Sequence, residues 1–123
     1  MTTKTIPTPQ EILTRAADLI DERGWCQHFL SGEAGDGTLS IVGAMRLATA
    51  HAVGITGVHA AELVEDAWPV EGRDELARVW EQATHAVGDR VGGCHIGVWN
   101  DMEGRAEREV VAVLRAAAEG GAQ

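Results

Sequence analysis

The chain has 123 residues, of which 45% are hydrophobic and 24% are charged, a size and composition typical of one folded domain and not of a disordered chain. Its formal net charge of −9 argues against nucleic acid or an anionic membrane surface as a partner, because both are bound by basic patches. No apolar run reaches the roughly 18 residues that a transmembrane helix needs, and two cysteines are too few for a secreted disulfide framework. We therefore expect one cytoplasmic domain over residues 1–123, with flexible ends at 1–7 and 120–123.

The first predicted helix spans residues 9–23. Thr8 and Glu11 have the spacing of a capping box, in which both side chains accept backbone N–H groups, and Pro9 stands at the first helical position, where proline is favoured. The apolar residues that follow recur at helical spacing and form one face: Ile12, Leu13, Ala16, Ala17, Leu19 and Ile20. Gly24 can adopt the positive φ that ends a helix.

Two further helices are expected in the middle of the chain. A loop over 31–38, rich in Gly and acidic residues, leads to an Ala-rich segment at 39–53. Within that segment Gly43 weakens the helix by about 1 kcal/mol relative to Ala. After a break at Gly54, a third helix is predicted over 58–68.

The second half of the chain contains the clearest amphipathic pattern, over 73–87, with Gly88 as the expected end of that helix. Its apolar stripe consists of Leu76, Val79, Trp80, Ala83, Ala86 and Val87. The glycine-rich stretch 89–97 predicts a loop with a short extended segment at 95–99, followed by a last helix at about 105–119. These elements together predict an all-α fold, a compact bundle of about five short helices.

The expected core consists mainly of small aliphatic residues, since the chain has four Trp, one Phe and no Tyr. At roughly 25 cal/mol per Å² of buried apolar surface, small side chains contribute little each. Each Trp is therefore expected to matter for stability, and a homodimer stays open as a way of burying more surface.

A first polar cluster, Trp25-Cys26-Gln27-His28, directly follows the first helix. A thiol at a helix C-terminus faces the negative end of the dipole, which disfavours the thiolate, so Cys26 is not expected to be an activated nucleophile. We expect Trp25 to fill the core, Cys26 to be a small buried residue and His28 to lie at the surface. With Cys94 the cluster also offers zinc-ligand residue types, but the spacings do not match the paired ligands of structural zinc sites. No metal or cofactor is therefore predicted.

A second cluster, Trp99-Asn100-Asp101, precedes the last helix. Asp101 at the head of that helix is expected to accept backbone N–H bonds as a cap. The functional alternative is that Asn100 and Asp101 line a pocket with Trp99 as its floor. The sequence has no phosphate-binding glycine loop, nucleophile elbow or H-E-x-x-H motif, which excludes only the easily recognised enzyme classes.

Three stretches carry a resemblance to a known family: residues 16–27, Val42-Gly43-Ala44, and Trp99-Asn100-Asp101 with Gly104-Arg105 and the final helix that follow. In these the chain resembles the domain of unknown function 6197, small uncharacterised actinobacterial and phage-associated proteins. Members often have a Cys shortly before the Gly-Ala pair, where this chain has Ser40 or Ile41. The resemblance implies no activity, but it implies that the three stretches meet in space.

The function that the sequence favours is that of a small, non-catalytic binding or accessory protein. It would present a groove between helices to a peptide or a small apolar ligand, so that its partner is a protein or a small molecule. The ligand-binding residues expected in that groove are Trp25, Trp99, Ser40 and Gly43.

Two alternatives stay open. The first is a small enzyme of specialised metabolism, in which His95 and Asp101 act as general acid or base together with Asn100. The second is a metal-binding protein, and its weak candidate ligands are Cys26, His28, Cys94 and His95.

Overall fold

The computed structural model describes residues 6–27, 38–55, 73–93 and 95–120. It has five helices in the described residues, namely α1 (Pro9–Arg23), α2 (Ile41–Ala52), α4 (Arg73–Arg90), α5 (Ile96–Asp101) and α6 (Glu107–Gly120). The all-α fold is confirmed, and only one isolated bridge, between Trp25 and Leu39, interrupts the helical architecture of the described chain. The helix predicted over 58–68 lies outside the described residues.

Helix α1 has the boundaries that its local signals predict. The Thr8 hydroxyl accepts the Glu11 N–H and the Glu11 carboxylate accepts the Thr8 N–H, both at 3.1 Å, which completes the capping box. Gly24 ends the helix with φ at +92° and donates its N–H to the Ile20 carbonyl at 2.7 Å. All six residues of the predicted apolar face are buried.

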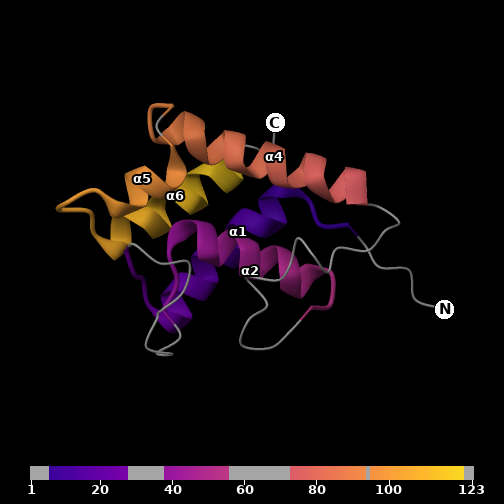
Figure 1. Ribbon diagram of the computed structural model, residues 1–123, viewed down its shortest axis with the longest axis horizontal. Helices are drawn as coiled ribbons and strands as arrows, with labels where there is room; N and C mark the ends of the chain where they lie inside the picture. The colour runs from indigo at the N-terminus through magenta and orange to yellow at the C-terminus, as the bar shows by residue number, and fades with distance from the viewer. Residues whose placement is uncertain (1–5, 28–37, 56–72, 94, 121–123) are drawn as a thin grey trace.

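Helix α1 lies at the centre of the bundle, in contact with α2, α4 and α6. In Figure 1, α4 runs along the top of the view above α6, and α1 and α2 cross each other below them. The apolar stripes of α4 and α6 face the resulting single core, where Ala83, Val87, Val110 and Leu114 are fully buried. This core also contains the buried faces of α1 and α2.

The prediction of an extended segment at 95–99 is wrong, because this stretch forms helix α5. Gly92 and Gly93, both with φ near +80° (77° and 80°), provide the turn between α4 and α5. Trp99 and Asn100 on α5 are both buried. Contacts of these two residues with distant parts of the chain outweigh the weak local helix preference of a segment rich in Gly and β-branched residues.

Smaller differences concern helix ends. Helix α4 continues through Gly88 to Arg90, and α6 begins at Glu107, two residues later than predicted, and ends at Gly120. At the N-terminal end, where flexibility was expected, Pro7 is buried. Among the described helices, none is both long and apolar enough to cross a bilayer.

Candidate functional site

Asn100 connects three separate parts of the chain. Its side-chain oxygen accepts the Trp25 indole N–H at 2.7 Å and the Ile41 backbone N–H at 2.9 Å. Its side-chain nitrogen donates to the Cys26 carbonyl at 3.2 Å and to the Asp101 carboxylate at 3.0 Å. The side chain thus fixes α5 both to the segment after α1 and to the first residue of α2.

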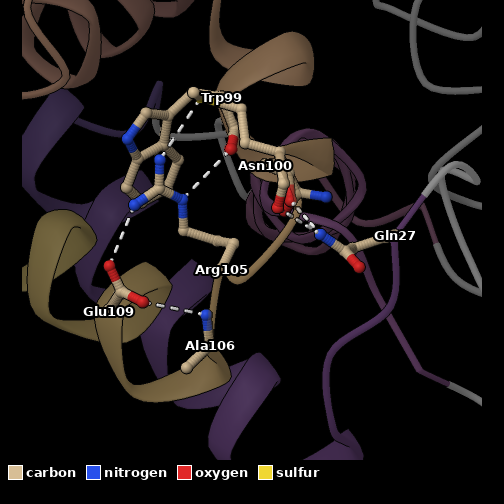
Figure 2. A network of polar contacts seen from close by, with 7 residues as sticks. Gln27, Trp99, Asn100, Arg105, Ala106 and Glu109 are labelled. Atoms are coloured by element: carbon tan, nitrogen blue, oxygen red, sulfur yellow. Dashed lines mark hydrogen bonds and ion pairs between the residues drawn. The ribbon is translucent and has the colours of Figure 1, made fainter.

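These contacts use the full hydrogen-bonding capacity of an amide, two acceptor sites and two donors. The residue is only 1% exposed, so each partner would be difficult to replace with water. Gln27 reinforces the connection by donating to the backbone carbonyls of Asn100 and Met102, both at 3.0 Å (Figure 2). Asn100 therefore holds the fold together and has no side-chain group left over for a ligand.

Trp99 lies beneath a guanidinium group. Arg105 stacks over its ring at 4.0 Å from the centroid and donates to the Trp99 carbonyl at 3.2 Å. Glu109 holds Arg105 in place through a 2.9 Å ion pair and also accepts the Ala106 N–H at 3.0 Å (Figure 2). The Arg105 hydrogen bond, followed by that from Ala106, keeps the pKa of the Glu109 carboxyl below its usual value. The arrangement covers the indole and secures the start of α6.

The four predicted ligand-binding residues have structural contacts. Trp25 is half-buried with its indole bound to Asn100, and Trp99 is 8% exposed within the core. Ser40 is the N-cap of α2, its hydroxyl accepting the N–H of the buried Gly43 at 3.0 Å. None of the four contributes to the lining of the cavities found among the described residues.

The three stretches of the family resemblance do meet in space, as expected. The Trp25 indole and the first N–H of α2 share the Asn100 oxygen, and Val42-Gly43-Ala44 follows directly in the first turn of α2. Asp101, by contrast, is the last residue of α5 and not the cap of α6. At the head of α6 it is Glu109 that accepts a backbone N–H, from Ala106. The expected cap was misplaced because α5 was not foreseen.

A groove does lie between helices, but next to the predicted residues and not among them. This α4–α5 groove has a volume of about 550 Å³ and receives residues from α2, α4, α5 and the turn before α5. Its lining consists of Val42, Trp80, Thr84, His85, Gly88, Asp89, Gly93, His95 and Ile96.

The α4–α5 groove combines an apolar floor with a polar rim. Trp80, Val42 and Ile96 are partly buried and pack against the core. His85, Asp89 and His95 are exposed, and no ion pair or hydrogen bond joins them to another described side chain. A hollow of this size with an aromatic floor and a few polar groups has the composition typical of small-molecule sites.

Two other hollows are less suitable. One of about 790 Å³ lies between α4 and α6 and shares Thr84, His85 and Asp89 with the groove, but no Trp or Phe occurs among its described lining residues. Another, of about 280 Å³, contains His51 and Arg15. Burial, and then the positive charges of Arg15 and Arg23, hold the pKa of the His51 imidazole below its usual 6.5.

The candidate residues of the metal-binding and enzyme alternatives lie partly within the described residues. In the described residues no group of three or more His, Cys, Asp or Glu side chains is placed to hold a metal ion, and His28 and Cys94 lie outside the described residues. Cys26 is half-buried, where full burial was expected. Of the acid–base residues, His95 lines the groove whereas Asn100 faces Trp25 and Ile41. The enzyme stays a prediction.

Sequence reasoning missed Trp80, His85 and Asp89 as members of one site. Trp80 was assigned to the apolar stripe of its helix, and Asp89 was placed in a loop because Gly88 was expected to end α4. One signal was available: residues 84 and 88, and residues 85 and 89, are spaced four positions apart, so a longer α4 would have placed these groove-lining residues on one helical face.

The protein is thus an all-α domain with a groove of small-molecule size, next to the buried Asn100 whose side-chain donors and acceptor sites are all occupied. The family of unknown function DUF6197 matches residues 4–120, and the chain belongs to that family. No curated protein and no solved structure matches the chain.

Proposed function

We propose that this is a non-catalytic binding protein that takes a small, largely apolar ligand into the α4–α5 groove. The observation that carries the proposal is the groove itself: about 550 Å³, within the range of roughly 300–1,000 Å³ in which small-molecule pockets fall. Its apolar floor would bury the body of the ligand, and its polar rim would orient it.

The surroundings of the groove support binding more than catalysis. Asn100, which the enzyme alternative needs, has both its donors and both its acceptor sites occupied. The turn at Gly93 and the start of α5 supply one wall of the groove, and the Asn100 contacts fix α5 in position. A wall held in this way is preformed, which lowers the entropic cost of binding. The low cysteine content makes the cytoplasm the compartment we favour for this protein.

Gly88 offers a way of closing the groove without disturbing the fold. It lies within α4 and lines the groove, and a Cβ atom added there would meet nothing within 4 Å. Gly88→Leu should therefore fill the groove, and Gly88→Ala is a matched control that adds one carbon. Both changes remove a helix-interior glycine, so neither is expected to lower stability.

The probe is naphthylbutanol, a neutral apolar alcohol, titrated by calorimetry and by the NMR signal of the Trp80 indole N–H. We expect saturable binding to the natural chain and to Gly88→Ala, and at least a tenfold loss of affinity in Gly88→Leu. The proposal fails if naphthylbutanol and its charged analogues all leave the indole signal unchanged. It also fails if Gly88→Leu binds as well as Gly88→Ala.

A further inference from the structure

We infer that the ligand of the α4–α5 groove is an organic cation, an amine with an elongated apolar body whose ammonium group pairs with Asp89. This inference rests on the proposed function and specifies its ligand class. Among the described residues that line the groove, Asp89 is the only carboxylate, and none is Lys or Arg. It is exposed and makes no ion pair with any described residue.

The position of Asp89 is unfavourable for the fold. It is the residue before Arg90, the last residue of α4, where the backbone carbonyls concentrate the negative end of the helix dipole. A carboxylate in that last turn opposes the dipole, and no described basic side chain compensates it with a direct contact. Residues that break a local rule without compensation are typical of functional sites.

The apolar and the anionic ends of the groove lie apart along α4. Trp80 and Asp89 are nine positions apart in one helix, which corresponds to about 13 Å along its axis. Because both residues line the groove, a ligand that contacts both must be elongated, with an apolar part against Trp80 and a charged end near Asp89. His85 and His95 line the same groove, and their rings offer further contact surface.

The overall charge points the same way. With 19 acidic and 10 basic side chains, the protein attracts cations and repels anions over long range, which raises the association rate of a cationic ligand. An anionic ligand would meet both this field and Asp89. A neutral ligand would gain the apolar contacts but would leave Asp89 without a partner.

The test uses three probes of the same shape: naphthylbutylamine, naphthylbutanol and naphthylbutanoate. Each is titrated into the full chain at low salt, with the Trp80 indole signal and calorimetry as readouts. We expect the amine to bind on the order of fivefold more tightly than the alcohol, and the acid to bind most weakly. The preference for the amine should shrink at high salt, because an exposed ion pair is screened.

Two variants of α4 separate a local pairing from the general charge. Asp89→Asn should bring the amine down to the affinity of the alcohol while leaving alcohol binding unchanged. Asp74→Asn, which removes the same charge from an exposed residue of the first turn outside the groove, should retain the preference. The melting temperature of Asp89→Asn should be equal or higher, since an acid is removed from the helix C-terminus.

The outcomes separate the two proposals. If the alcohol binds in a manner blocked by Gly88→Leu but the amine binds no better, the groove is a ligand site and the cation inference is wrong. An equal loss in the Asp89 and Asp74 variants also overturns the inference, because bulk charge then accounts for the preference. If none of the three probes binds, the proposed function itself fails.

Discussion

Replacing Asn100 with Asp tests whether this side chain organises the fold. The change keeps the shape and turns the side-chain nitrogen into an oxygen. That atom lies 3.2 Å from the Cys26 carbonyl oxygen and 3.0 Å from the Asp101 carboxylate. Two hydrogen bonds, worth about 1 kcal/mol each, are lost, and two negative oxygens face each other instead.

The magnitude follows from these contacts. Repulsion between adjacent carboxylates adds at least about 1–2 kcal/mol, whereas the charged oxygen strengthens the bonds it accepts from Trp25 and Ile41 by about 1 kcal/mol. We expect Asn100→Asp to lower the free energy of unfolding by about 3 kcal/mol at neutral pH, a large fraction of the roughly 5–15 kcal/mol that holds a domain together.

Urea unfolding followed by circular dichroism measures this change. The deficit should shrink as the pH is lowered, because two adjacent carboxylates disfavour each other's charge and the one that takes up a proton can donate a hydrogen bond again. Adding Asp101→Asn to Asn100→Asp removes one of the two charges and restores a hydrogen-bond donor. The double variant should therefore lose less stability than the sum of the losses in the two single variants. A deficit under about 1 kcal/mol at neutral pH would refute the reasoning.

Four further changes are expected to have smaller effects. Gly24→Ala should cost about 1–2 kcal/mol in urea unfolding, since φ there is +92° and a Cβ would lie 3.2 Å from the Thr38 methyl carbon; a loss under 0.5 kcal/mol, roughly the scale of ordinary surface changes, would contradict this. Arg105→Ala should cost about 1–2 kcal/mol through lost stacking and hydrogen bonding, with Arg105→Lys recovering only part; equal stability of the two variants would show that the planar guanidinium is unimportant. The pKa of His51 is lowered in the folded protein, so below the usual imidazole value of 6.5 the unfolded chain binds more protons than the folded one. The free energy of unfolding should therefore fall as the pH drops below 6.5. His51→Gln should reduce this decline, and parallel curves of stability against pH for the two proteins would contradict it. Gly88→Ala should raise the free energy of unfolding by about 0.5–1 kcal/mol, and a destabilised variant would show that the groove wall needs glycine.

The parts of the fold that sequence reasoning predicted are those with local causes. The capping box of Thr8 and Glu11 and the stop at Gly24 lie within a few residues of the helix they delimit, so α1 could be bounded from the sequence. Its apolar face was complete for the same reason. These signals involve neighbouring residues and require no knowledge of the rest of the chain.

Helix α5 and the groove could not be found in this way. Asn100 contacts Trp25 and Ile41, which are 75 and 59 positions away in the sequence. No sequence pattern near residue 100 predicts these contacts. The resemblance to the family did place these stretches together, but without saying that they would make structural contacts. The groove was not predicted because Gly88 was expected to end α4. A helix packed against a core tolerates the cost of one glycine, and α4 continues past it.

The long reach of the Asn100 contacts has a kinetic consequence. Bonds that span 75 and 59 positions form only after the intervening chain has been ordered, because closing such a loop costs entropy before any contact is gained. These hydrogen bonds therefore form late during folding and break early during unfolding. Their loss should accelerate unfolding while leaving the rate of folding nearly unchanged, so that the lifetime of the native state, and with it resistance to proteolysis, depends on one amide.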